Sequence, residues 1–421
     1  MYDGDWLFRL SQFARHGRGG GGLRLPANVW GLGITSLLTD ISSEMVVSIL
    51  PAYLVLTGGF TPAVLGLAAG LHEGGPLLAT WLGGLVADRF GRRKLTAGAG
   101  YALSAISRLA WVMFASPRAA GVAAFVVADR AGKSIRTAPR DALISLSVDR
   151  DQLATAFGVH RALDAAGAAA GPVLAFALLW AMPRRYDVIF FTSFVIALLG
   201  LAALALLVDE RAPQAASAPP GRSVWAEAFA LFGDMPLRRI LVLAASFGLV
   251  TISDAFIYLL LVQRSHASAV WIPLLYTGTA LSFLTLAIPI GMLADRIGRR
   301  RIFVAGHGSL LVVYLLTLSH APLWPWNAMI SVALLGAFYA SSEGVLAGLA
   351  GDLLPAEVRA TGLAWVATAL SGARLCGALM FGVLWTRAGD AAAVAVFGAA
   401  LAAVLLAFAL FIEVPPAPGQ V

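Results

Sequence analysis

Long apolar runs, separated by short polar stretches, fill most of the chain from residue 28 onward. A helix needs about 20 consecutive apolar residues to cross the hydrocarbon core of a bilayer. Windows of that size predict twelve helices, six on each side of a polar stretch between Glu210 and Arg222. Their ranges are 28–57, 63–87, 95–115, 119–147, 154–181, 186–208, 238–263, 270–294, 302–319, 326–350, 361–386 and 391–413. The pattern predicts an all-α membrane protein with twelve transmembrane helices in two six-helix bundles.

The two halves carry the same short polar segment. Asp88-Arg-Phe-Gly-Arg-Arg-Lys94 returns as Asp295-Arg-Ile-Gly-Arg-Arg-Arg301, and the offset, 295 − 88 = 207 residues, is about half of the 421-residue chain. Each copy joins two predicted helices and follows a glycine, Gly84 or Gly291, by four residues. Duplicated bundles related by an axis along the membrane normal are typical of transporters.

The predicted helices set the expected boundaries of the chain's parts. We expect a cytoplasmic arm at 1–27, an N-terminal bundle at 28–208, a cytoplasmic linker at 209–237, a C-terminal bundle at 238–413 and a tail at 414–421. The linker is rich in Pro, Ala and Ser, which is typical of flexible segments. A charge at Arg9 interrupts the apolar stretch of the arm, so the arm is not a secretory signal. Disorder and an interfacial amphipathic turn both fit it.

Composition and charge indicate that the chain is embedded in a membrane and how it is oriented there. Hydrophobic residues make up 59% of the chain and charged residues 13%, and the mean hydropathy is +0.82, which excludes a water-soluble surface at this length. With both termini in the cytoplasm, eighteen arginines and lysines fall on the inside and five on the outside, as the positive-inside rule requires. The net charge of +7 then needs no nucleic-acid partner, because this rim meets anionic lipid headgroups.

The repeated polar segment resembles the loop signature between helices 2 and 3 of the major facilitator superfamily. The matching positions of the first copy are Gly84, Asp88, Arg89, Gly91 and Arg92, and those of its weaker repeat between helices 8 and 9 are Asp295, Gly298 and Arg299. The resemblance implies that Asp88 latches the outward-open state. A solvated loop that only fixes topology is the alternative for its basic residues.

Three other segments extend the resemblance. Gly167, Gly171 and Pro172 are similar to a helix-5 signature common among exporters of the superfamily, although uptake members also carry a Gly-Pro there. The stretches 39–45 and 129–144 resemble a bacterial branch whose members are mostly known only as permeases. The branch likeness implies alternating access in a bacterial inner membrane and leaves the substrate open. Val126 occupies a helix-4 position where the family often has arginine, so that role passes to Arg130 or is absent.

Charged side chains at membrane depth carry the candidate chemistry, because they persist there only when paired or facing a watery cavity. The predicted proton carriers are the carboxyl groups of Asp40, Glu44, Glu73 and Asp164. The predicted substrate-binding residues are Lys133, Arg136, Arg130, Asp254, Tyr258 and Glu343. Two alternatives stay open: six acids and six bases of the first half neutralise one another in a structural network, and Asp254 and Glu343 are solitary protonated acids.

The sequence lacks the signatures of catalysis and of cofactors. It has no Gly-x-x-x-x-Gly-Lys loop and no metal-spaced cysteines, and the single cysteine, Cys376, is expected to be buried in an apolar helix. His72 and His160 each have an acid nearby and leave a metal site conceivable.

We therefore predict a monomeric secondary transporter, not an enzyme, that exports a small organic compound by proton antiport. Uptake of an anionic metabolite or metal chelate is the alternative that Lys133 and Arg136 favour. A transporter-like sensor and a membrane-embedded enzyme are less favoured, because the chain has neither a soluble output domain nor a nucleophile–base set.

Overall fold

The computed structural model describes residues 25–75, 93–114, 118–149, 151–210, 235–318, 324–353 and 359–411, and every regular element in these ranges is a helix. The first half contains α2 (Ala27–Pro51), η1 (Ala52–Thr57), α3 (Pro62–Glu73), α5 (Arg93–Met113), α6 (Ala119–Leu146), α7 (Leu153–Ala181) and α8 (Tyr186–Leu207). The second half contains α10 (Met235–Val250), α11 (Asp254–Arg264), η3 (Ala269–Trp271), α12 (Ile272–Ile297), α13 (Arg299–Leu318), α14 (Trp326–Leu353), α15 (Arg359–Ala388) and α16 (Asp390–Phe411).

The predicted all-α membrane fold is confirmed. Within the described ranges, nine helical segments are long and apolar enough to cross a membrane, counting α10 and α11 as one. The described α3 is 12 residues long, and α5 and α6 are too polar to be counted. The number of twelve spans therefore stays a prediction, although every predicted span overlaps a helix and the one at 63–87 is described as far as residue 75.

One predicted helix is broken, which corrects the continuous span at 238–263. Helix α10 ends at Val250, α11 begins at Asp254, and the three residues between them are not helical. Tyr314 of α13 satisfies the backbone at the break: its hydroxyl accepts the Ile252 N–H at 2.7 Å and donates to the Val250 carbonyl at 3.1 Å. Broken helices occur in membranes where such a partner replaces the lost backbone hydrogen bonds.

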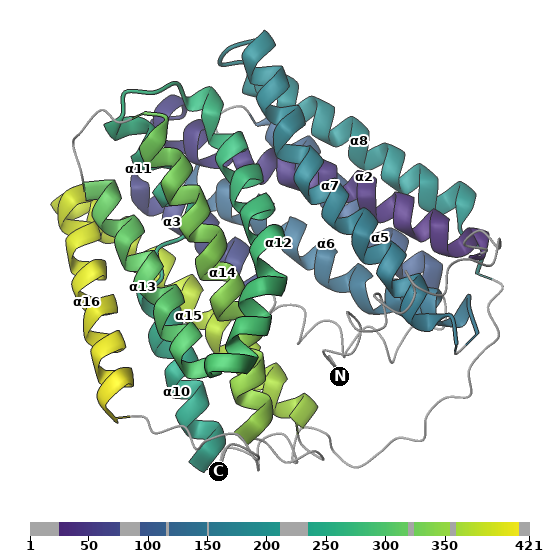
Figure 1. Ribbon diagram of the computed structural model, residues 1–421. Helices are drawn as coiled ribbons and strands as arrows, with labels where there is room; N and C mark the ends of the chain where they lie inside the picture. Colours follow the sequence, from purple (N-terminus) through teal and green to yellow (C-terminus); the bar gives the residue numbers. More distant parts are fainter. Residues whose placement is uncertain are drawn as a thin grey trace.

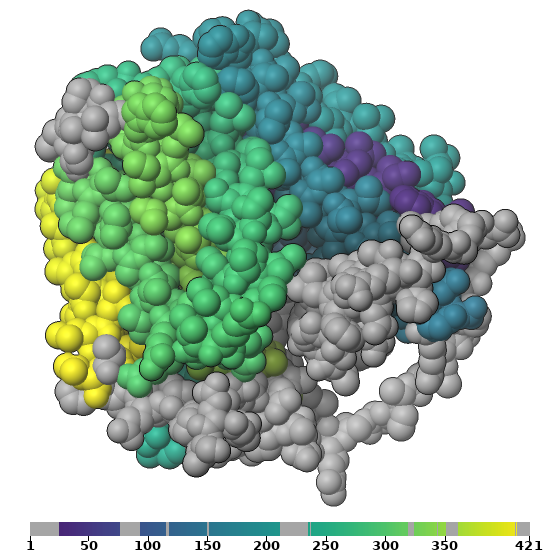
Figure 2. Space-filling model, in the orientation of Figure 1, coloured from purple at the N-terminus to yellow at the C-terminus, as the bar shows by residue number. Residues whose placement is uncertain are grey.

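The helices form two groups (Figure 1). Helices α2 and α5–α8, drawn from purple to teal, lie on one side, and α10–α16, drawn from teal-green to yellow, lie on the other. Several pairs of helices join the two halves: α3 packs on α15, α7 packs on α12, and α2 contacts both α11 and α12. In Figure 2 the blue-teal atoms of α7 adjoin the green atoms of α12 along one face. The predicted domain boundaries stay a prediction.

Glycines let the two groups approach closely where α3 meets α15. A Cβ atom at Gly66 would lie 2.5 Å from the Ala378 carbonyl oxygen, and one at Gly382 would lie 2.6 Å from the Pro62 carbonyl oxygen. At the same end of the pair, the Ala63 N–H donates to the Thr386 hydroxyl at 3.0 Å. Backbone contact of this kind between membrane helices needs small residues.

The helix-5 motif also makes close helix contacts. A Cβ atom at Gly167 would lie 2.5 Å from the Leu37 carbonyl oxygen, and one at Gly171 would lie 2.6 Å from the Ile41 carbonyl oxygen. These two glycines therefore bring α7 directly against α2.

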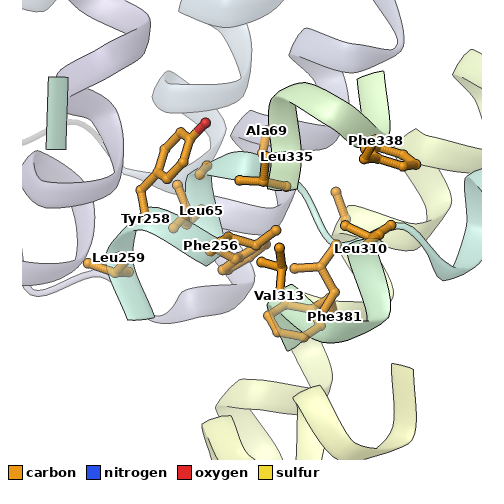
Figure 3. Close-up of a cluster of buried hydrophobic side chains, with 14 of the residues drawn as sticks. Leu65, Ala69, Phe256, Tyr258, Leu259, Leu310, Val313, Leu335, Phe338 and Phe381 are labelled. Atoms are coloured by element: carbon orange, nitrogen blue, oxygen red, sulfur yellow. The ribbon is translucent and has the colours of Figure 1, made fainter. Parts of the chain in front are cut away.

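The largest hydrophobic core draws on both halves of the chain. Figure 3 shows part of it, where Leu65 and Ala69 of α3 lie near Phe256 and Tyr258 of α11, and Phe381 of α15 packs close by. The rings of Phe256 and Phe381 are 4.8 Å apart. The interface at which α3 of the first half packs on α15 of the second half, which we call the joint between the halves, is therefore part of this core.

Candidate functional site

A cavity of about 290 Å³ lies between the two groups of helices. Its apolar lining includes Trp111 and Phe125, whose rings pack edge to face at 5.1 Å. Its polar lining comes from Ser43, Glu44, His72, Glu73, Ser107, Arg108, Asp129, Thr251, Ser253, Asp254, Tyr276, Tyr339 and Arg374. A second cavity of about 230 Å³ shares Glu44, Asp254, Tyr276 and Tyr339 with the first.

The helix break brings Asp254 to the cavity. Asp254 is the first residue of α11, and the extended residue Ser253 precedes it. Both side chains therefore lie at the start of a helix and not in its interior. The Asp254 carboxylate accepts hydrogen bonds from the Tyr339 hydroxyl at 2.9 Å and from the Tyr258 hydroxyl at 3.2 Å. These contacts favour the interpretation of Asp254 as part of a polar patch over that of a solitary acid.

Tyr258 lies outside the lining of both cavities. Its side chain is fully buried, it is not among the residues that line either cavity, and its hydroxyl also contacts the Thr279 hydroxyl at 2.7 Å. The predicted role in direct substrate contact therefore has no geometric support, and Tyr258 instead orients Asp254.

Glu73 lies where the two halves meet. It ends α3 in the first half, whereas Arg374 belongs to α15 in the second half and Ser253 directly precedes α11. All three residues line the larger cavity. Glu73 and Arg374 thus lie on the same helix pair, α3 and α15, whose glycines let the halves approach closely.

The basic residues of α6 face acids within the first half, not the cavity. Asp40 lies 4.0 Å from the Lys133 ammonium and 3.7 Å from the Arg136 guanidinium. Asp129 contacts Arg130 at 2.5 Å and Arg108 of α5 at 3.1 Å. The predicted binding residues Lys133, Arg136 and Arg130 are absent from the lining of both cavities, as is Asp40. This geometry supports the structural-network alternative for them.

Asp164 belongs to a second polar group between α2, α6 and α7. Its carboxylate accepts a hydrogen bond from Ser36 at 2.5 Å, and Arg140 donates to the Ser36 hydroxyl at 3.4 Å. Arg140 also forms an ion pair with Asp141 at 2.9 Å. Asp164 is not among the residues that line the two cavities, so its predicted role in proton transfer gains no support from its position.

The second copy of the loop motif joins α12 to α13. Gly298 adopts φ +103°, a conformation that side-chain-bearing residues rarely adopt, so glycine is required there. Arg299 pairs with Asp295 at 3.2 Å and donates to the Gly348 carbonyl of α14 at 3.3 Å. The first copy, with Gly84, Asp88, Arg89, Gly91 and Arg92, lies outside the described residues. So does the side chain of Glu343.

The exposure of Cys376 differs from the expectation of a buried thiol. Cys376 is exposed because it lies on the outward face of α15, whereas its neighbours Gly377 and Ala378 pack inward.

The histidines form no metal centre with other described residues. Among the described residues, no three His, Cys, Asp or Glu side chains are grouped so as to hold a metal ion. His72 lines the cavity, and His160 is buried away from it.

Sequence reasoning missed several residues of the cavity as site residues. Arg374 carried a detectable signal, because a charge within an apolar run is rare, yet its place beside α3 in the cavity lining depends on the tertiary fold. Arg108 and Asp129 carried the same signal. Tyr276 carried none, because one tyrosine in an apolar helix is ordinary.

Comparisons with known proteins identify one family. The family model described as Major Facilitator Superfamily matches residues 32–281 and 255–421. An uncharacterized MFS-type transporter of Methanocaldococcus jannaschii is 31% identical over 368 residues, which cover 86% of this chain and 89% of that protein. An uncharacterized protein of Mycobacterium tuberculosis is 27% identical over 397 residues, covering 90% of this chain and 91% of that protein.

Solved structures share the fold. The nucleoside transporter NupG superposes with a TM-score of 0.77 at 13% identity, covering 92% of this chain and 99% of that one. A D-xylose-proton symporter superposes with a TM-score of 0.68 at 16% identity, covering 92% of this chain and 98% of that one. At these identities the likeness concerns the fold alone.

Proposed function

The chain belongs to the major facilitator superfamily, and from that premise we propose that it exports a small organic compound in exchange for protons. The family makes it a multi-pass membrane transporter of the MFS type. The substrate, the direction of transport, the coupling ion and the monomeric state are our proposals. We further propose that it works by alternating access around the cavity between its halves.

One observation carries the proposal of proton coupling: Glu73 of α3 in the first half and Arg374 of α15 in the second half line the same cavity, on the two helices that join the halves. A carboxyl group beside a base that moves can take up a proton in one arrangement and release it in the other. Protonation of Glu73 removes its attraction for Arg374 and loosens the joint between α3 and α15. The charged form draws the two helices together again.

Uptake of an anionic compound gains no comparable support. That alternative relied on Lys133 and Arg136, whose charged groups lie within 4.0 Å of Asp40 rather than on the cavity. Withdrawing both bases from Asp40 to bind a substrate would leave a buried carboxylate without a counter-charge, which is costly.

The experiment that tests the function uses everted membrane vesicles with an acidic interior. We expect at least one compound in a panel of organic cations, anions and neutral molecules to release the proton gradient in vesicles that contain the protein. Vesicles without the protein are the control. Release that requires sodium, or that no compound produces, would reject proton antiport.

We also propose that the protein lies in a bacterial inner membrane with both termini in the cytoplasm. The exposed Arg301 is the last residue of the second loop motif, and the exposed Arg387 lies in the last turn of α15, which the predicted topology places on the outer side of the membrane. In a Cys376→Ala background, we expect Arg301→Cys to react with a membrane-impermeant thiol reagent from the cytoplasmic side and Arg387→Cys from the outside. The reverse pattern in intact cells would invert the orientation.

Asp88 is proposed to latch the outward-open state, as the family resemblance implies. Asp88→Asn is expected to reduce transport at least about tenfold while expression stays near normal, because the sequence predicts Asp88 in a loop between helices and a solvated acid contributes little to stability. Transport and protein level in membranes are the measurements. Asp209→Asn, which changes an exposed acid, is the control. Normal transport by Asp88→Asn would show that Asp88 does not latch the outward-open state.

A further inference from the structure

The lining of the larger cavity carries an excess of negative charge. Among its described residues are four acids, Glu44, Glu73, Asp129 and Asp254, against two arginines. Arg108 lies 3.1 Å from one of these acids, Asp129. With four acids against two arginines, the formal charge of the described lining is negative.

The two cavities meet at four residues, which we call the shared site: Glu44, Asp254, Tyr276 and Tyr339. Glu44 belongs to α2 in the first half, whereas the other three belong to α11, α12 and α14 in the second half. A ligand at the shared site therefore contacts both halves at once, as alternating access around a central site requires.

Hydrogen bonds and ring packing hold the second-half side of the shared site in place. The hydroxyls of Tyr339 and Tyr258 donate to the two carboxylate oxygens of Asp254, at 2.9 and 3.2 Å. The ring of Tyr276 packs edge to face on the ring of Tyr258, with centroids 4.6 Å apart. The carboxylate and the aromatic ring of Tyr276 are thus fixed before any ligand arrives.

The bases of α6 that face α2 have acids of the first half close by. Arg130 donates a hydrogen bond to the hydroxyl of Ser43, the residue before Glu44, at 3.1 Å. Lys133 lies 4.0 Å from Asp40, and Arg130 lies 2.5 Å from Asp129. An anionic ligand at the shared site would meet two carboxylates, and like charges brought together in a cavity of low polarity repel strongly.

We propose that the shared site binds an organic cation, with Asp254 and Glu44 as its counter-charges and the rings of Tyr276 and Tyr339 against its apolar parts. Carboxylates together with aromatic rings recognise quaternary ammonium groups, because the ring face attracts a cation while its surface covers the methyl groups. Trp111 and Phe125 extend the apolar lining for an aromatic or alkyl portion. This inference rests on the proposed transport function and names the chemical class of its substrate.

A binding experiment tests the charge preference without any ion gradient. Purified full-length protein is titrated calorimetrically with benzyltrimethylammonium, with benzenesulfonate as an anion of similar size and with benzyl alcohol as a neutral compound. We expect saturable binding of the cation, and binding at least about tenfold weaker for the other two. Equal or tighter binding of the sulfonate, or no saturable binding of the cation, would overturn the proposal.

Matched variants locate the binding. Asp254→Asn and Glu44→Gln are each expected to weaken cation binding about 30-fold or more, since each removes a counter-charge in a desolvated cavity. Tyr276→Leu is expected to weaken it about threefold to tenfold, while Tyr276→Phe retains the ring and most of the affinity. Asp187→Asn and Glu210→Gln change exposed acids elsewhere and are the controls. Cation affinity unchanged in both Asp254→Asn and Glu44→Gln would overturn the site.

The two proposals fail in different ways. If the cation binds as described but no compound releases a proton gradient from vesicles, proton antiport is wrong and the cation site stands. If vesicles show proton exchange with anionic or neutral compounds only, the antiport stands and the cation site is wrong.

Discussion

Glu73→Gln is expected to abolish gradient-driven movement of substrate while leaving substrate exchange intact. The amide keeps the shape of the side chain, but it can neither bind nor release a proton in the transport cycle. It also lacks the negative charge that, in our proposal, attracts Arg374 in the lining of the same cavity, so we expect the contact between α3 and α15 to loosen without a proton. We expect the rate of gradient-driven transport to fall at least about tenfold.

Proteoliposomes separate the two activities of this variant. Accumulation is measured with an imposed pH gradient, and exchange is measured with labelled substrate on one side and unlabelled substrate on the other. Glu210→Gln, an exposed change of the same kind, is the control. Full accumulation by Glu73→Gln would show that Glu73 is not the proton carrier. Asp40→Asn, Glu44→Gln and Asp164→Asn test the other predicted carriers in the same assay.

Asp129→Ala is expected to give the largest loss of stability. The Asp129 carboxylate lies 3.1 Å from Arg108 and 2.5 Å from Arg130, and the two arginine side chains are only 3% and 8% exposed. Removing one partner of a buried pair leaves a charge without compensation, which destabilises a protein by about 3–5 kcal/mol. We expect a much lower yield of folded protein and a lower Tm in detergent.

Two comparisons isolate the cause of that loss. Asp187→Ala breaks an exposed pair with Arg185, whose side chains are both 61% exposed, and should change the Tm little. Asp129→Ala combined with Arg108→Met removes opposite charges together and should recover part of the loss, because an apolar side chain needs no counter-charge. A wild-type Tm for Asp129→Ala alone would show that this pair does not stabilise the first half.

The positions of the helices were predictable because the bilayer imposes a length of about 20 apolar residues on each span. The break between Val250 and Asp254 was not, because it depends on Tyr314, a residue more than sixty positions away that satisfies the backbone there. A hydropathy window reads only local composition. It cannot register a hydrogen bond that arrives from another helix.

The candidate site was predictable in part for a similar reason. Glu44, Glu73 and Asp254 stood out as acids in apolar helices, and all three line the cavity. The same rule also selected Lys133 and Arg136, which contact Asp40 inside the first half. A charge at membrane depth signals a partner or a cavity, and only the fold decides between the two.

The central claim, that the charge of Glu73 controls the joint between the halves, is tested most directly by a distance across that joint. Spin labels at Thr61 and Arg387, in a Cys376→Ala background, report on the end of the α3–α15 pair where the Ala63 N–H contacts the Thr386 hydroxyl at 3.0 Å. Our account predicts that the distance lengthens when the wild-type protein is acidified, and that Glu73→Gln shows the longer distance at every pH. An identical distance distribution in both proteins at all pH values would contradict it.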